Sequence, residues 1–272
     1  MRTSSNPVFR NLPKTKGGYA GFGSGPATAA PQYGGTATQY QQPQPYSTSR
    51  SMTIDDVVTK TAMTLGVLVV TALVAALLCA NNPGLIGPLA IGGSIVALVL
   101  VLVATFGKKM NPAIVLTYAA AEGVAVGAIS FVFANIFGSA LVGQAVIGTI
   151  GVFAGMLVVY KTGAIRVTPK LTRMIVGGLI GVLALMVVNL LGNLVFNFDM
   201  GLRSGGPLAI GFSVLCIAIA AFSFLLDFDQ ADKMIRAGAP EKAAWGVALG
   251  LTVTLVWLYL EILRLLSYFN SN

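Results

Sequence analysis

The chain has 272 residues, of which 56% are hydrophobic and 10% are charged. Soluble globular proteins carry about 25% charged residues, so this composition excludes a soluble domain and indicates an integral membrane protein. The net charge of +8 comes from basic residues scattered near the ends of apolar segments. That distribution is typical of membrane topology signals and of contacts with anionic lipids, and it argues against nucleic-acid binding.

Residues 1–59 differ in composition from the rest of the chain. Gly, Pro, Gln, Ser, Thr and Tyr dominate them, and they contain no apolar run long enough for a signal peptide. We therefore expect a disordered cytoplasmic tail that is not cleaved, followed by a transmembrane domain over residues 60–272. The tail is either a passive extension or a docking segment for a partner protein.

The sequence after the tail predicts an all-α integral membrane protein with seven transmembrane helices. A spanning helix needs about 20 mostly apolar residues, and polar or Pro/Gly positions divide the chain into seven such segments. The expected spans are 61–80, 85–106, 112–137, 140–160, 171–191, 207–228 and 243–269.

The loops predict the orientation of these spans, because short loops rich in Lys and Arg stay in the cytoplasm. Basic residues gather in the tail and in the second, fourth and sixth loops, whereas the other side has only Arg203 and Arg264. We therefore expect a cytoplasmic N-terminus and an external C-terminus.

Three pairs of glycines spaced four residues apart predict places where helix backbones approach closely. Glycine is also common in membrane helices generally, so any one pair can be without such a role. The pairs are Gly123 with Gly127, Gly151 with Gly155, and Gly177 with Gly181.

Acidic residues inside apolar spans are the main candidates for function, because an ionisable group in a bilayer costs about 2.5 kcal/mol or more. Glu261 lies in the last span, three residues before Arg264, so the two can pair on one helix face. Two interpretations stay open. Glu261 and Arg264 neutralise each other near the outer interface, or Glu261 points inward toward another carboxylate.

The sixth span ends in an acidic segment that could supply this second carboxylate. Asp227 directly follows an apolar run, Asp229 is intermediate, and Asp232 is expected to be solvated beside Lys233. Two carboxylates within a few ångströms share a proton, because both cannot ionise cheaply. Ca²⁺ prefers oxygen ligands and would compete with that proton. Asp227 and Glu261 together would therefore form a proton-sensitive gate and a tentative Ca²⁺ site.

Glu122 lies in the middle of the third span, with no basic residue within one helical turn. Either it is protonated and hydrogen-bonded to a neighbouring helix, or it lines a cavity. We treat Glu122, together with Arg264, as a secondary candidate for the gating site.

Several segments resemble one known family. The last span contains LYLEILRLL over residues 258–266 and follows a span with an acidic end, and the third span contains YAAAEGVAVGAIS over residues 118–130. With the NPVF start at residues 6–9, these segments resemble the Bax inhibitor-1 family, also called the transmembrane Bax-inhibitor-motif family. The resemblance is to its bacterial, actinobacterial type and covers the chain from about residue 60 onward.

The resemblance implies a seven-helix fold in a bacterial plasma membrane, with the last helix surrounded by the other six. It also implies a pH-sensitive Ca²⁺ leak controlled by a di-carboxylate between the sixth and seventh helices. Glu261 matches the acid of the last helix, and Asp227 or Asp229 matches that of the sixth. The interval between these acids is longer than in the family pattern, so a direct pair would need a sixth helix, or a connection between the sixth and seventh helices, that extends into the cytoplasm.

The leading hypothesis is therefore a cation leak gated by carboxylate protonation, with Ca²⁺ as the candidate permeant ion and no other cofactor. The alternative is a non-conducting regulator that binds a membrane protease or another stress-response partner in the bilayer. An enzyme is disfavoured, because the chain has no histidine, no aspartyl-protease context around Asp227 or Asp229, and no nucleotide-binding glycine motif. The pattern indicates no particular oligomeric state.

Overall fold

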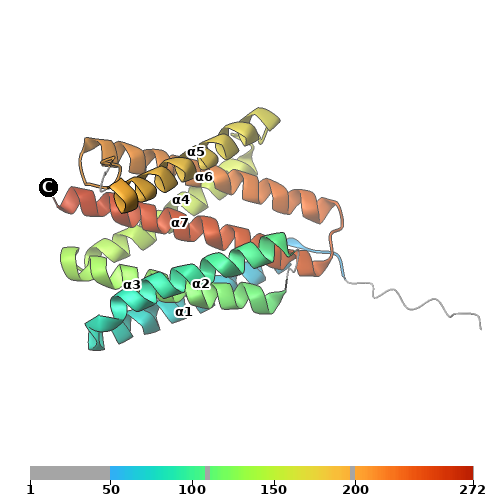
Figure 1. The fold of residues 1–272 in the computed structure, drawn as a ribbon. Coiled ribbons are helices and arrows are strands. Elements are labelled where there is room, and N and C mark those ends of the chain that lie inside the picture. The colour runs from blue at the N-terminus through green and yellow to red at the C-terminus, as the bar shows by residue number, and fades with distance from the viewer. Residues whose placement is uncertain (1–49, 108–110, 197–199, 272) are drawn as a thin grey trace, which may run out of the picture. The chain divides into compact units, whose positions relative to one another are not determined.

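The structure is a computed structural model that describes residues 50–107, 111–196 and 200–271. α-Helices make up most of these residues (Figure 1). They are α1 (Ile54–Asn81), α2 (Ile86–Phe106), α3 (Pro112–Phe137), α4 (Ser139–Thr162), α5 (Pro169–Phe196), α6 (Pro207–Arg236) and α7 (Ala244–Asn270). Short 3₁₀ turns, η2 (Pro83–Leu85) and η3 (Glu241–Ala243), precede α2 and α7. The predicted all-α fold is confirmed, since the described ranges hold no strand beyond a single bridge between Ser51 and Pro240.

Each of these seven helices is long and apolar enough to cross a membrane. A helix satisfies its own backbone hydrogen bonds, which is why it can enter hydrocarbon where water is absent. Many large apolar side chains of α1, α2 and α5 are exposed, as expected for faces that meet lipid. The chain is therefore a multi-pass membrane protein.

Helix α1 begins earlier than the apolar pattern predicted, at Ile54. The reason is a capping box, in which the Asp56 N–H donates to Thr53 Oγ1 and the Thr53 N–H donates to the Asp56 carboxylate. Residues 54–59, which were expected to belong to the disordered tail of residues 1–59, are therefore helical. The rest of that prediction, over residues 1–49, lies outside the described residues.

Helix α6 also extends further than predicted, continuing past Phe228 to Arg236. Its last two turns carry pairs at i,i+4, Asp229 with Lys233 and Asp232 with Arg236, which support helix in a polar segment. Thirty residues of helix measure about 45 Å, more than the roughly 30 Å of bilayer hydrocarbon. The sixth helix is thus long enough to emerge from the membrane.

Helix α7 is the most buried of the seven spans. It packs mainly against α1, α3, α4 and α6, while α2 packs on α3 and α5 packs on α6. In Figure 1 α7, in red, runs through the middle of the helices. The expected central position of the last helix is confirmed, although only four of the other helices supply most of its packing.

The tightest helix crossing joins α1 and α3 at Gly123 and Gly127. A Cβ added at Gly127 would lie 2.1 Å from the carbonyl oxygen of Ala72, and one at Gly123 would lie 2.4 Å from that of Leu68. Only glycine allows the two backbones to approach this closely. The glycine pairs in α4 and α5 face open space instead, so the prediction is confirmed for one pair and wrong for the other two.

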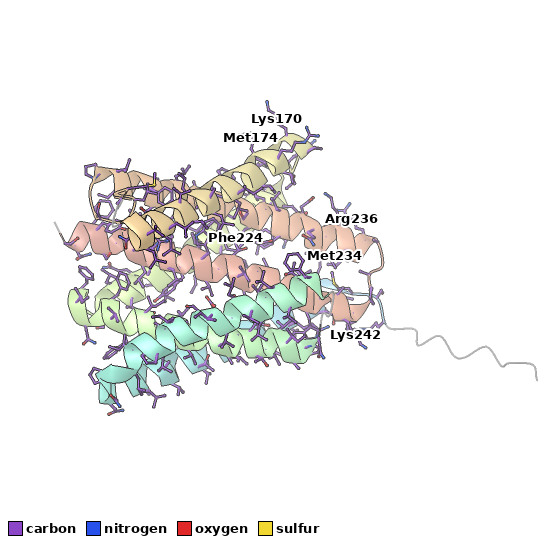
Figure 2. The ribbon with its side chains drawn as sticks, in the orientation of Figure 1. Lys170, Met174, Phe224, Met234, Arg236 and Lys242 are labelled. Atoms are coloured by element: carbon purple, nitrogen blue, oxygen red, sulfur yellow. The ribbon has the colours of Figure 1, made fainter. Side chains whose placement is uncertain are left out.

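The two ends of the helices differ in charge. We call the end where α1 and α7 begin the basic end, and the opposite end, which carries Arg203 and Arg264, the distal end. The Met52 N–H donates to the Ala239 carbonyl, which places the start of α1 beside the α6–α7 connection. Figure 2 shows the basic end with Lys170, Arg236 and Lys242.

Candidate functional site

The interface between α6 and α7 holds the deepest acidic side chain of the described residues. Glu261 is 1% exposed. Its Oε1 accepts a hydrogen bond from Ser213 Oγ on α6 at 2.7 Å, and its Oε2 accepts one from Arg264 Nη1 at 2.6 Å. Arg264 lies almost one turn further along α7, so its side chain reaches the same face. The Glu261–Arg264 ion pair of the first interpretation is present, and its position near the outer interface stays a prediction.

Asp227 faces α7 nearer the basic end. Its Oδ2 accepts a hydrogen bond from Thr254 Oγ1 at 2.9 Å, and a Cβ added at Gly250 would lie 3.9 Å from its Oδ1. Thr254 Oγ1 is also 3.1 Å from the Gly250 carbonyl oxygen, so two acceptors share its single proton. Among the described residues no Lys or Arg forms an ion pair with Asp227. Asp227 is thus a half-buried carboxylate with one shared hydroxyl donor.

Asp227 and Glu261 do not form the pair that the sequence predicted. Thr254 and Glu261 are seven residues apart on α7, about 10 Å along the axis. Ser213 and Asp227 are 14 residues apart on α6, about 21 Å. The physical reason is the register of the two antiparallel helices, in which residues equally far from the α6–α7 connection lie opposite each other. Asp227 is 13 residues before Pro240 in this connection, and Thr254 is 14 residues after it, so these two meet. Glu261 is 21 residues after Pro240 and lies further along α7. Extending α6 beyond the bilayer does not change this register.

The other two acids of α6 have cationic partners on their own helix. Asp229 pairs with Lys233 Nζ at 2.5 Å, and Asp232 pairs with Arg236 Nη2 at 2.9 Å. Asp229 also lines a surface cavity of about 540 Å³ between α5 and α6 at the basic end. The Asp232 side chain is 37% exposed, as expected for a solvated residue.

Glu122 is half-buried on α3 and forms no hydrogen bond or ion pair with any described residue. Residues at i and i+4 share one helix face, and this face of α3 meets α7 at two places. Tyr118 packs in one cluster with Trp245, and the hydroxyl of Ser130 lies 2.7 Å from that of Tyr259. Because Glu122 lies between Tyr118 and Ser130, it lies on the α7 side of α3. The hydrogen-bonded alternative for Glu122 is not found within the described part of the chain.

Aromatic rings hold α6 against α4 beside Asp227. Phe224 is fully buried, and its ring centroid lies 5.2 Å from that of Phe153 in an edge-on arrangement. Phe228 makes a similar contact with Phe153 at 5.6 Å. Figure 2 labels Phe224 among the packed side chains. Edge-on aromatic pairs favour one geometry, so they fix the side of α6 next to Asp227 and orient Asp227 toward α7.

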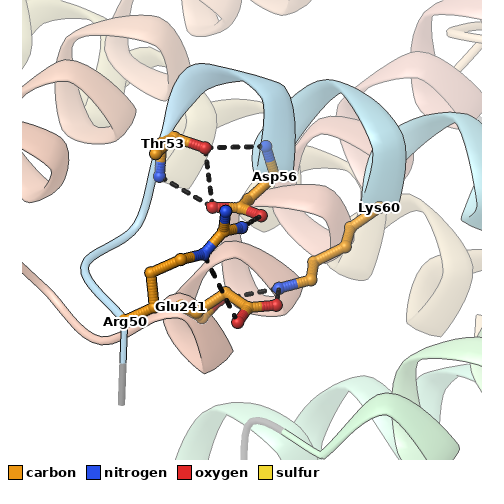
Figure 3. Close-up of polar contacts among 5 residues, drawn as sticks. All are labelled: Arg50, Thr53, Asp56, Lys60 and Glu241. Carbon is orange, nitrogen blue, oxygen red and sulfur yellow. Dashed lines mark hydrogen bonds and ion pairs between the residues drawn. The ribbon is translucent and has the colours of Figure 1, made fainter. Parts of the chain in front are cut away.

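A second group of charges lies at the basic end. This terminal cluster consists of Arg50, Asp56, Lys60 and Glu241 (Figure 3). Lys60 Nζ donates to the Glu241 carboxylate at 3.1 Å and to its carbonyl at 2.8 Å, and Arg50 pairs with Asp56. Lys60 Nζ also lies 5.7 Å from the ring centre of Trp245. With two acids and two bases the cluster is balanced in charge, and it ties the start of α1 to the start of α7.

The oxygens around Asp227 form only part of a metal site. Within the described ranges no three His, Cys, Asp or Glu residues lie where they could hold one metal ion. Ca²⁺ takes six to eight oxygen ligands, and Asp227 with Thr254 and the Gly250 carbonyl supplies fewer. The sequence predicted a tentative Ca²⁺ site shared by Asp227 and Glu261, but in the structure each carboxylate has different hydrogen-bond partners.

Sequence reasoning missed the two hydroxyl partners, Ser213 and Thr254. A signal was present, because Gly250, Thr254 and Glu261 fall on one face of α7. That signal is ambiguous, since hydroxyls in helices often bond their own backbone. Thr252, for example, donates to the Ala248 carbonyl at 2.8 Å.

Comparison with known proteins agrees with this architecture. A family model described as Bax inhibitor 1 like matches residues 6–271, nearly the whole chain. The chain belongs to the Bax inhibitor 1-like family. The match to the Bax inhibitor 1-like family begins well before residue 60, so it includes more of the N-terminal part than the resemblance predicted. No curated protein matches the sequence.

Proposed function

We propose that this Bax inhibitor 1-like protein is a pH-sensitive cation leak in which Asp227 takes up either a proton or a cation. Ca²⁺ is the expected permeant ion. The supporting observation is the state of Asp227, a carboxylate inside the helices with one shared hydroxyl donor. An unpaired carboxylate in an apolar interior is costly to keep ionised, and either a proton or a metal ion lowers that cost.

Proton uptake and cation binding exclude each other at Asp227, because both use its oxygens. When Asp227 is ionised, the Thr254 hydroxyl donates to Oδ2, and Oδ1 beside Gly250 is available to a cation. When Asp227 is protonated, the Thr254 hydroxyl still has the Gly250 carbonyl as an acceptor. The protonated Asp227 carboxyl can then donate to Thr254 Oγ1, which lies 2.9 Å from Oδ2, so neither hydroxyl is left without an acceptor in either state.

The remaining acids take different roles in this proposal. Glu122 is a second acidic residue of the path, because it faces α7 between Tyr118 and Ser130 and lacks a described partner. Asp229 is paired with Lys233 at the basic end and is assigned to the entrance. Glu261 is neutralised by Arg264 and positions α6 against α7 through Ser213.

Cation flux into proteoliposomes containing the full chain tests the proposal. We expect Ca²⁺ entry, followed with an internal fluorescent indicator, that depends on pH in the wild-type protein. The Asp227→Asn variant keeps the shape of the side chain but cannot ionise, so its flux should fall and lose its dependence on pH.

The matched control is Asp232→Asn, which removes the same charge from a solvated pair on the same helix. Its flux should match the wild type across the pH range. Wild-type flux that persists with the same pH dependence in Asp227→Asn would contradict the proposal.

A non-conducting regulator is the second candidate. The observation that favours it is the terminal cluster, which fixes the residues before α1 to the α6–α7 connection. A membrane-protein partner bound to the N-terminal residues would then act directly on α7. Proteoliposomes with wild-type protein that leak no faster than empty ones at any pH would favour this candidate.

The proposal also places the protein in a bacterial plasma membrane with the basic end in the cytoplasm. This orientation rests on the loop charges, since Lys161, Arg166, Lys170, Lys233 and Lys242 lie near that end. Accessibility of single cysteines introduced near each end to a membrane-impermeant reagent would test it in intact cells.

A further inference from the structure

A cavity of about 400 Å³ lies at the distal end, between α5, the start of α6 and their connection. Its volume falls within the roughly 300–1,000 Å³ typical of small-molecule sites. The wall is mostly apolar, and three polar side chains line it, Asn189, Asn193 and Arg203. The apolar lining residues are Met186, Val187, Leu190, Leu202 and Phe212.

The polar side chains of this cavity offer hydrogen-bond donors that lack a strong acceptor among the described residues. Asn189 Oδ1 accepts the Met200 N–H at 2.9 Å, so the other end of its amide is a donor. Asn193, one turn along α5, forms no hydrogen bond with a described residue. Among the described residues, the acceptor of Arg203 is the sulfur of Met186 at 3.4 Å, and a thioether is a weak acceptor. A ligand rich in acceptor oxygens would satisfy all three side chains.

Among the described residues, the charges next to the cavity are net positive. Of these residues, Arg264 and Glu261 are the charged groups that act on Arg203, and Glu261 is already paired with Arg264. Arg203 forms no ion pair with a carboxylate among the described residues. Desolvation and then the charge of Arg264 lower the pKa of the Arg203 guanidinium, which nevertheless stays protonated. Negative charge on a ligand would stabilise Arg203.

We propose that this cavity binds the phosphate group of an anionic phospholipid, with its acyl chains lying along α5. The planar fork of a guanidinium matches phosphate oxygens, and the amides of Asn189 and Asn193 add neutral donors. Leu190 in the wall is 65% exposed, and Leu183 and Leu194 continue an exposed apolar surface along α5. A free phosphate ion would satisfy the donors but would leave this apolar wall uncovered, which is why the ligand is a lipid.

Lipid binding by the purified full chain tests this proposal. Detergent-solubilised protein is titrated with phosphatidylglycerol or phosphatidylcholine, and bound lipid is counted by native mass spectrometry. Thermal unfolding in the same titration gives a second readout. We expect phosphatidylglycerol to be retained and to raise the unfolding temperature, with phosphatidylcholine at least about tenfold weaker. Arg203→Gln should weaken phosphatidylglycerol binding by about tenfold, the effect of losing one charge-assisted contact.

Matched variants separate the cavity from general surface charge. Arg166→Gln removes an exposed arginine from the α4–α5 connection at the basic end and should change the affinity less than twofold. Asn193→Ala should weaken binding severalfold without changing net charge, and it carries the test if Arg203→Gln does not fold. Equal losses in Arg203→Gln and Arg166→Gln would overturn the proposal. Inorganic phosphate alone giving the full stabilisation would overturn the assignment to a lipid.

Discussion

Two carboxylates lie at the interface between α6 and α7, Glu261 on α7 and Asp227 on α6, and the fold compensates their charges differently. Glu261 is fully buried, and it has both a guanidinium and a hydroxyl as partners. Asp227 is only half-buried, and it has a single hydroxyl that a carbonyl also accepts. Depth alone therefore does not identify the functional acid. The acid whose charge is left uncompensated is the one with capacity to bind a proton or a cation.

The largest expected effect is on stability, when the compensated carboxylate is removed. Glu261→Ala leaves Arg264 partly buried and unpaired and Ser213 without its acceptor, which should lower the free energy of unfolding by about 3 kcal/mol or more. Unfolding in mixed micelles with increasing denaturing detergent measures this change. The double variant Glu261→Ala, Arg264→Met should recover much of the loss. A single variant as stable as the wild type would remove the distinction between the two acids.

A smaller effect is expected at the hydroxyl that serves Asp227. Thr254→Val keeps the shape of the side chain but removes the donor, so an ionised Asp227 loses one hydrogen bond worth about 1 kcal/mol. We expect cation flux to fall roughly fivefold, as that free energy implies. Thr254→Ser retains the hydroxyl and should stay close to the wild type. Equal flux in the Val and Ser variants would show that the contact between Thr254 and Asp227 plays no part.

The smallest effect is expected at the surface pair of α6. Lys233 is 71% exposed, and an exposed pair at i,i+4 contributes only about 0.3–0.5 kcal/mol. Lys233→Ala therefore serves as the control for Thr254→Val in the stability measurement, and its flux, which reports on Asp229 at the entrance, should change less than that of Thr254→Val. A larger loss of flux in Lys233→Ala than in Thr254→Val would indicate that Asp229, and not Asp227, is the acid that controls the flux.

The sequence predicted the spans well, because long apolar runs are a property of composition. It misplaced the start of α1 and the end of α6, because the residues that extend these helices are polar. Asp56 acts there as a cap, and Asp229 and Asp232 act as i,i+4 partners. The terminal cluster escaped prediction for another reason, since Lys60 and Glu241 are 181 residues apart and only the folded chain joins them.

The acidic residues of the site could be named from the sequence, but their partners could not. Glu261 and Arg264 are close in sequence, so their pairing was one of the two stated alternatives. The position of Asp227 against α7 depends on the length of the α6–α7 connection, which sets the register of two antiparallel helices. A hydroxyl such as that of Thr254 has a backbone acceptor as well, so its role becomes visible only when Asp227 is placed beside it.

The most direct test of the account is whether Ca²⁺ displaces a proton from Asp227. Infrared difference spectroscopy of the reconstituted protein detects the protonated carboxyl group directly. At a pH where that group is partly protonated, adding Ca²⁺ should reduce its signal, and the change should be absent in Asp227→Asn and present in Asp232→Asn. A carboxyl signal that does not respond to Ca²⁺, or that responds equally in Asp227→Asn, would contradict the claim that a proton and a cation compete for Asp227.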